Sequence, residues 1–196
     1  MIPIKINFQA WNDLNDFKGF VISNLSQLNF VDTNKELIAN YNLNIANNYS
    51  ARKLKDYNFS KYTVSPELEK ETILNLENND IEKEVIVYGR SLLMNTEYCV
   101  IGSYKNCDRK CKQGKFVLKD RLGFEFPVYT DTFNCNNYIY NSKITSIEWK
   151  DLNTNNIRID ILEESPDEII KIIEAHKKSN RLEGQDYTNG NLNREI

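Results

Sequence analysis

The chain has 196 residues and a net charge of −3, with 40% hydrophobic and 27% charged residues. This balance is typical of a globular protein with one substantial core, and it excludes both a disordered chain and a protein that coats nucleic acid through bulk positive charge. No run of about 18 apolar residues is present, so we expect no membrane-spanning segment.

Short apolar runs typical of buried strands alternate with helical patterns along the chain. The predicted strands are 17–23, a segment within 37–46, 61–65, 84–88 and 157–162. Alternation of strands and helices at this spacing indicates parallel βα units, whose buried strands are continuously apolar.

Helices are predicted after three of these strands. A short helix follows residues 47–50 and runs through Leu54. Ser65 and Pro66 suit the N-cap and first position of a second helix, and residues 165–167 precede a third. Their apolar faces contain Leu68, Ile73, Leu74 and Leu76 in the second helix, and Ile169, Ile170, Ile172 and Ile173 in the third.

The predicted fold class is α/β, a partial (β/α)8-type barrel with an inserted β-rich, cysteine-containing subdomain. A whole barrel needs about 250 residues, so the alternatives are a partial barrel, a smaller open sheet, or half of a structure completed by another chain. We divide the chain into βα units of the partial barrel (1–89), the cysteine-containing insert (90–149), and a last βα unit with the tail (150–196). Within the insert, 115–119 and 124–129 have the pattern of hairpin strands.

The insert holds every cysteine of the chain: Cys99, Cys107, Cys111 and Cys135. The N-terminus, Met1 to Ile6, lacks the layout of a secretory signal, so we expect reduced thiols in the cytoplasm. The spacing is C-x7-C-x3-C-x23-C. Four thiolates suit either a tetrahedral zinc ion or a [4Fe–4S] cluster, and plain buried thiols are the third alternative.

Several short segments of the chain form an ordered signature. They are Tyr88-Gly89-Arg90, Leu93-Met94, Glu97-Tyr98-Cys99, Leu118 to Gly123, Phe126-Pro127-Val128, Asp131, Cys135 and Ile139 to Ser142, preceded by Tyr41 to Asn44 and Ser65 to Leu68 and followed by Tyr187 to Arg194. Together they resemble the central signature of the peptidase U32 family, and the resemblance extends over the chain from about Phe17 onward.

The resemblance implies a (β/α)8-like barrel in which the four cysteines bind a [4Fe–4S] cluster. Similar family members take part in hydroxylation of tRNA, of ribosomal RNA or of the ubiquinone ring without molecular oxygen, and several depend on prephenate. Others carry the older label of protease or collagenase. The family's barrel begins before the residues matched here, so the implied partners are tRNA or rRNA and a chain that supplies the missing barrel units.

The ends of the predicted strands offer four candidate substrate-binding residues: Asn44, Glu67, Arg90 and Arg158. A guanidinium at Arg90 suits a bidentate clamp on a carboxylate or phosphate, or a salt bridge to Glu97 or Asp120. Glu67 is also favoured in the first turn of a helix by the helix dipole alone.

The sequence leaves open whether the chain is an enzyme. A peptidase normally needs a base beside its nucleophile, and the single histidine, His176, lies in an amphipathic helical pattern. No HExxH motif is present. The alternatives are therefore RNA hydroxylation, a U32-type peptidase with unassigned catalytic residues, and a non-catalytic protein whose metal site only stabilises the insert.

Overall fold

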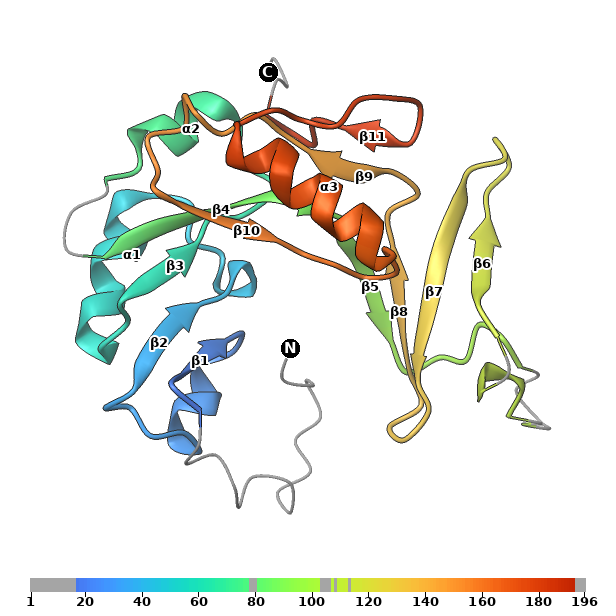
Figure 1. The fold of residues 1–196 in the computed structure, drawn as a ribbon. Coiled ribbons are helices and arrows are strands. Elements are labelled where there is room, and N and C mark those ends of the chain that lie inside the picture. The colour runs from blue at the N-terminus through green and yellow to red at the C-terminus, as the bar shows by residue number, and fades with distance from the viewer. Residues whose placement is uncertain (1–16, 78–80, 103–106, 108, 113, 193–196) are drawn as a thin grey trace.

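A computed structural model describes residues 17–77, 81–102, 107, 109–112 and 114–192. The structure is mixed α/β, with a mainly parallel sheet of seven strands and a separate antiparallel sheet of four (Figure 1). These residues form no closed barrel. They also include no helix of the length and apolarity that crossing a membrane requires.

Five parallel strands lie side by side in the order in which they occur along the chain. They are β1 Gly19–Ile22, β2 Glu36–Ala39, β3 Lys61–Thr63, β4 Glu82–Gly89 and β10 Asn156–Ile159. Each overlaps a strand expected from the sequence, so the prediction of parallel βα units is confirmed at the level of an α/β sheet.

The strand β4 changes its neighbour along its length. Its first half pairs with β3, whereas Tyr88 and Gly89 pair antiparallel with β9, Ile144–Ser146. The two-residue strand β11, Tyr187–Thr188, then pairs parallel with β9. A β-carbon on Gly89 would lie 2.7 Å from the Asp160 carbonyl oxygen, and Gly89 has a φ of +138°. This close approach to Asp160 and the positive φ both favour glycine at position 89.

In the part of the chain that the structure describes, three α-helices accompany the strands: α1 Asn48–Lys53, α2 Lys70–Asn75 and α3 Pro166–Lys177. Ser165 caps α3, because its hydroxyl accepts from the Glu168 N–H while the Glu168 carboxylate accepts from the Ser165 N–H, and Pro166 occupies the first turn. The predicted start of the third helix is therefore confirmed. The described residues also contain four 3₁₀ segments: Leu25–Asn29, Tyr41–Leu43, Leu54–Tyr57 and Lys110–Lys112.

The predicted start of the second helix is wrong. Ser65 and Pro66 form a turn, in which the Leu68 N–H donates to the Ser65 carbonyl oxygen at 3.2 Å, and α2 begins only at Lys70. The Lys70 N–H donates to the carbonyl oxygen of Leu192 at 3.0 Å. A contact with the distant tail thus sets the first turn of α2, and the local capping signal does not.

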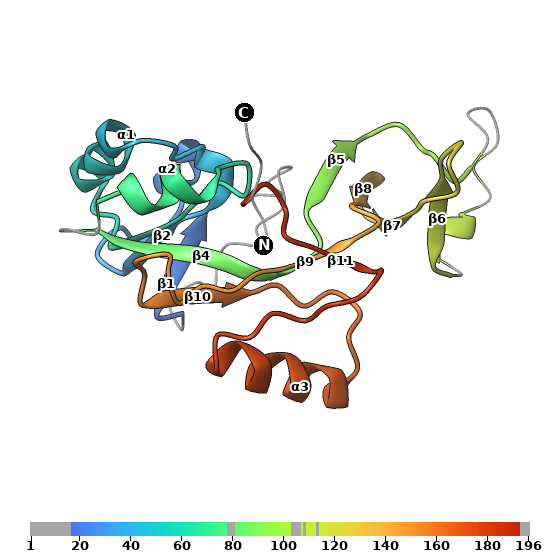
Figure 2. The same cartoon turned by 90° about the horizontal axis from the view of Figure 1, so that it is seen from above.

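Helices cover both faces of the parallel strands (Figure 2). The Lys83 amine reaches the end of α2 and donates to the carbonyl oxygens of Ile73 and Leu76 at 2.8 and 3.1 Å. On the other face, the Tyr88 ring lies 6.0 Å from the His176 ring of α3. In a (β/α)8 barrel all helices surround the strands on one side, and α3 departs from that arrangement.

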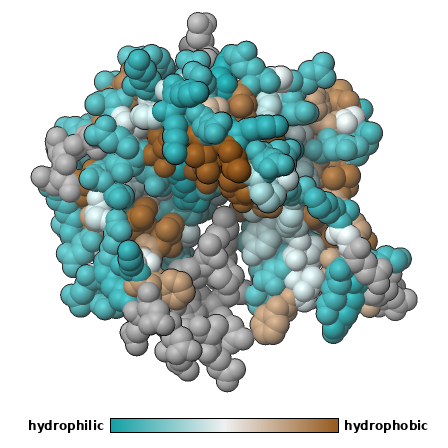
Figure 3. Space-filling model, viewed as in Figure 1, coloured by the Kyte–Doolittle hydropathy of each residue, from teal (hydrophilic) through white to brown (hydrophobic). Residues whose placement is uncertain are grey.

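The main core lies between the parallel strands and the helices α1 and α2. Its fully or almost fully buried members include Ile22, Leu37, Ala39, Tyr62, Val64, Ile73, Leu76, Val85 and Val87. The α3 side is less completely covered. Figure 3 shows apolar side chains gathered over α3 and β10, and the exposed ones there are Ile161, Ile170 and Ile173.

The second sheet lies within the predicted insert. Its strands are β5 Leu92–Thr96, β6 Phe116–Lys119, β7 Glu125–Asp131 and β8 Asn136–Tyr140, in the order β5-β8-β7-β6. The predicted hairpin segments 115–119 and 124–129 contain β6 and most of β7, so that prediction is confirmed. Asp120 closes their turn by accepting the N–H groups of Leu122 and Phe124.

Candidate functional site

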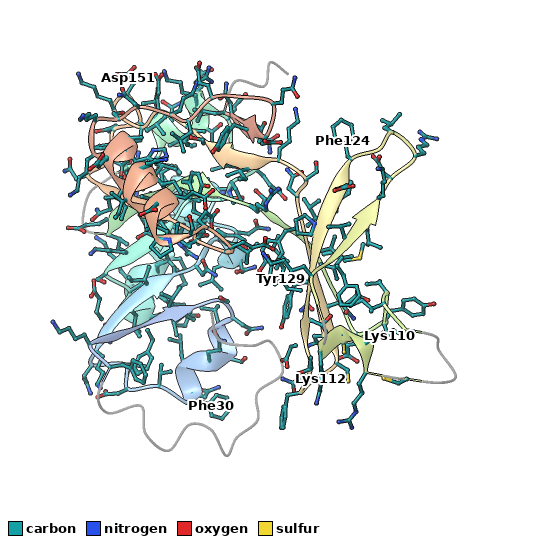
Figure 4. The ribbon with its side chains drawn as sticks, turned by 45° about the vertical axis from the view of Figure 1, so that its right-hand side comes forward. Phe30, Lys110, Lys112, Phe124, Tyr129 and Asp151 are labelled. Carbon is teal, nitrogen blue, oxygen red and sulfur yellow. The ribbon has the colours of Figure 1, made fainter. Side chains whose placement is uncertain are left out.

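All four cysteines belong to one end of the four-stranded sheet. Antiparallel pairing brings the end of β5, the start of β6, the end of β7 and the start of β8 to the same side. Cys99 follows β5, Cys107 and Cys111 lie between β5 and β6, and Cys135 directly precedes β8. Figure 4 shows Lys110 and Lys112 at this end and Phe124 at the opposite one. The topology therefore collects segments that are up to 36 residues apart, between Cys99 and Cys135.

Asn137 ties the cysteine segments together. Its side chain is fully buried, and its amide donates to the Tyr98 carbonyl oxygen at 2.9 Å. Its own amide oxygen accepts the Thr130 hydroxyl at 2.8 Å. Tyr98 directly precedes Cys99 and Asn137 follows Cys135 by two positions, so one side chain positions the backbone of both cysteine segments.

The turn between β7 and β8 is built by Asp131. Its carboxylate accepts from the N–H groups of Phe133 and Asn134 and from the Asn134 side-chain amide. The hydrogen bond from the Asn134 side chain is the main reason that the pKa of Asp131 lies below its usual value. Cys135 ends the turn with a φ of 55°. These hydrogen bonds therefore fix the backbone of the turn that leads to Cys135.

The cysteines are free thiols. Cys99, Cys107 and Cys135 are exposed and Cys111 is half-buried, and the Gly102 N–H donates to the Cys99 sulfur at 3.2 Å. Four thiols at one end of a sheet are a chemically suitable set of ligands for a thiolate-bound metal centre. In the described part of the chain, however, no three or more His, Cys, Asp or Glu side chains converge on a common point. Within the described residues, the four cysteines thus belong to one end of the sheet, but their thiols are not arranged around a common metal position.

The candidate residue Arg90 binds backbone. One guanidinium nitrogen donates to the carbonyl oxygens of Asn141 and Ser142 at 2.8 and 2.6 Å. Arg90 therefore fixes the connection from β8 to β9. The sequence had predicted either a clamp on an anion or a salt bridge to Glu97 or Asp120, and not this role. It also lines a small pocket with Tyr41, Gly89 and Asp160.

The candidate residue Arg158 joins three strand ends. It contacts the Asp160 carboxylate at 2.6 Å and the Asn40 amide oxygen at 2.8 Å. Asn40 in turn donates to the Ser23 hydroxyl at 2.9 Å. Burial, followed by the charge of Asp160, raises the pKa of the neighbouring Tyr41. Arg158 thus holds β1, β2 and β10 together at their carboxyl ends.

The other two candidates are exposed. Asn44 ends a 3₁₀ segment in the left-handed conformation, with a φ of 58°. Glu67 lies in the turn before α2 and lines a pocket of about 330 Å³, which we call the edge pocket. Arg90 belongs to the adjoining small pocket, and the two pockets share Pro66, Ile86, Ser91, Leu92 and Thr145. The structure thus brings Glu67 and Arg90 into neighbouring pockets.

Sequence reasoning did not single out Asn137, Ser91 or Thr145. Asn137 lies two positions after a cysteine, but its role depends on the register of β5 and β7 on either side of β8. Ser91 directly follows Arg90 at the end of β4, and this position at a strand end is the signal that marked Arg90. Thr145 gave no signal, since an antiparallel strand at this edge was not expected.

His176 is completely buried on α3. Neither ring nitrogen has a hydrogen-bond partner among the described residues, and burial lowers the pKa of the imidazole. The Trp149 indole N–H donates to the backbone oxygen of His176. An imidazole in this position has no access to a substrate and is therefore unsuited to be the base of a peptidase.

Comparison with protein-family models, curated proteins and solved structures found no match to this chain. The resemblance to the peptidase U32 family therefore stays a prediction.

Proposed function

We propose that the chain is a U32-like protein whose Cys99, Cys107, Cys111 and Cys135 ligate a [4Fe–4S] cluster, with zinc as the alternative. The observation that supports this most directly is the gathering of four free thiols at one end of the small sheet. When bound, a cluster would supply one-electron chemistry. Because the thiols do not converge in the described structure, metal binding would be coupled to closure of the cysteine segments.

The proposed role is oxygen-independent hydroxylation of RNA, either tRNA or rRNA, and the proposal includes dependence on prephenate. Asn44, Glu67, Arg90 and Arg158 are its proposed substrate-binding residues. In support, Glu67 and Arg90 line adjoining pockets at the carboxyl edge of the parallel sheet, where open α/β sheets bind ligands. Arg158 would act through the strand ends that it joins. The free thiols favour a cytoplasmic location.

This role is tested by comparing RNA nucleosides by mass spectrometry in cells that lack the gene. Complementation with the wild-type gene should restore a hydroxylated nucleoside, and complementation with Cys107→Ser should not. Immunoblotting of the soluble fraction checks that the variant and the wild type accumulate to equal amounts. If the deletion loses no hydroxylated nucleoside, the proposed RNA chemistry is wrong.

A non-catalytic metal protein is the second candidate, and one distance favours it. Arg90 precedes the start of β5, whereas the cysteines gather at its far end. β5 has five residues, so it spans roughly 15 Å at the usual strand rise. A ligand in the edge pocket would not touch a metal held at the cysteine end. No observation favours the peptidase alternative, because His176 is buried.

We also propose that the parallel sheet is part of a (β/α)8-type barrel. Its support is the sequential order of β1, β2, β3, β4 and β10 in one parallel sheet. A second chain carrying further βα units is the corresponding partner. It would pair with the outer edge of β1 or of β10, and size-exclusion chromatography of the two chains together would detect the complex.

A further inference from the structure

The edge pocket lies where β4 changes its neighbour from β3 to β9. Its volume of about 330 Å³ falls within the range of small-molecule sites. Its lining residues come from the segment after β3, from β4, β9 and α2, from the start of β5 with Asn141 after β8, and from the tail segment 188–192. The pocket is therefore built where the two sheets meet, and none of its lining residues is a cysteine.

The inner wall of the pocket is apolar. Val64, Val85 and Ile147 are at most 5% exposed, and they belong to the main core. Such a wall suits the flat or weakly polar face of a small ring. Apolar walls with a few placed polar groups are the usual composition of ligand sites.

The polar groups of the pocket are hydroxyls and amides. Ser91 and Thr145 are half-buried, and among the described residues their hydroxyl groups have no hydrogen-bond partner. By contrast, the Asn191 amide is already engaged with the Pro66 carbonyl oxygen at 3.4 Å. A partly buried hydroxyl gains most from a ligand that can both donate and accept a hydrogen bond.

The described residues that line the pocket offer an anion no counter-charge. Among them there is no Lys, Arg or His, and Glu67 is the one charged residue. Arg90 belongs to the adjoining pocket, where one nitrogen already serves two backbone oxygens. Phosphate and carboxylate groups are normally held by Arg or Lys. The lining therefore disfavours both.

The tail forms one wall and is fixed in place. Leu192 accepts the Lys70 N–H at 3.0 Å, and β11 pairs with β9 next to the pocket. Gly190 has a φ of +60°, and a β-carbon there would lie 3.7 Å from the Thr145 methyl group. Thr145, which lines the pocket, is thus held at the junction of β9 and the tail.

We infer that the edge pocket binds a small uncharged molecule rich in hydroxyl groups, either a sugar or a nucleoside without phosphate. The apolar wall receives the ring, and Ser91 and Thr145 exchange hydrogen bonds with ligand hydroxyls. This inference needs neither a metal nor RNA chemistry, because it depends on the lining of the pocket alone.

The test is isothermal titration of the purified chain with the four ribonucleosides, with glucose and with uridine 5′-monophosphate, at millimolar concentrations. Thr145→Val keeps the shape of the side chain and removes the hydroxyl. Thr132→Val, at an exposed turn of the small sheet, is the matched control. Losing one neutral hydrogen bond should weaken binding about fivefold. Should Thr145→Val fail to fold, Ser91→Ala tests the same point.

Binding of a nucleoside or of glucose would support the inference if Thr145→Val weakens it and Thr132→Val does not. Which of the two probes binds would show whether the ligand is a nucleoside or a sugar. The phosphate ester should bind no more tightly than uridine. The inference is overturned if no neutral probe binds, if the pocket variants bind like the control, or if the phosphate ester binds tenfold more tightly. Metal analysis of the same samples separates this result from the proposed metal function.

Discussion

The side-chain amide of Asn137 donates a hydrogen bond to the backbone oxygen of Tyr98 across 2.9 Å. The two residues are 39 positions apart, and each lies next to a cysteine segment. This contact positions Cys99 relative to Cys135 before any metal is bound. The proposed metal centre therefore depends on a neutral, buried amide as well as on the thiols.

Replacing Asn137 tests this dependence. Asn137→Ala removes two hydrogen bonds from a fully buried site, and we expect a loss of roughly 2 kcal/mol in the free energy of unfolding. Urea denaturation followed by circular dichroism measures it. Asn95→Ala, at an exposed position on β5, is the matched control and should stay close to wild type. Equal stability of the two variants would show that the amide does not hold the cysteine segments.

Replacing Gly89 tests the crossing of β4 and Asp160. A β-carbon there would lie 2.7 Å from both the Asp160 β-carbon and its backbone oxygen, at a φ of +138°. Gly89→Ala should therefore cost roughly 2–4 kcal/mol of stability, or prevent folding. Gly114→Ala is the control, since nothing lies within 4 Å of a β-carbon at Gly114. A thermal unfolding midpoint unchanged by Gly89→Ala would contradict the described approach.

The buried imidazole of His176 predicts a pH dependence of stability. Burial lowers its pKa in the folded protein, so between that pKa and the unfolded value of about 6.5 the unfolded chain binds more protons. Stability should then fall as the pH drops below about 6.5. Since His176 is the single histidine of the chain, His176→Phe should remove this part of the pH dependence.

The measurement is denaturant unfolding of wild type and His176→Phe between neutral pH and pH 5. The difference in stability should shift in favour of the variant as the pH falls. A difference that stays constant over this range would mean that the imidazole is not buried in its neutral form.

The buried amine of Lys83 predicts a change in the alkaline range. Burial lowers its pKa below the ordinary value of 10.5, so the unfolded chain binds more protons between the two pKa values. Wild-type stability should therefore rise, relative to Lys83→Met, as the pH increases toward 10.5. Denaturant titrations at neutral and alkaline pH test this, and a difference independent of pH would contradict it.

Local signals in the sequence sufficed for much of the fold. Each of the five parallel strands was expected from its apolar run, and Ser165 with Pro166 marked the start of α3. The same reasoning failed at Ser65, because the Lys70 N–H bonds to Leu192, a contact with the distant tail. The antiparallel β9 and the placement of α3 on the second face also arise from long-range packing, which periodicity does not report.

The candidate site, too, could be predicted from the sequence only in part. The cysteines were identified from residue type and spacing, and the antiparallel sheet explains how the chain gathers them. The role of Arg90 was not predicted, because its partners are the backbone oxygens of Asn141 and Ser142. Every residue has a backbone oxygen, so the residue types do not indicate which ones Arg90 contacts. Thr145 reaches the edge pocket only through the pairing of β9 with β4 and β11.

The central claim is that the four cysteines hold a metal centre, and anaerobic purification followed by iron, sulfide and zinc analysis tests it most directly. We predict about four irons and four sulfides per chain, with the visible absorption of a cluster, both lost in Cys107→Ser. Stoichiometric zinc without sulfide would replace the cluster by a structural zinc site. Anaerobically purified, folded protein without iron or zinc would contradict the claim.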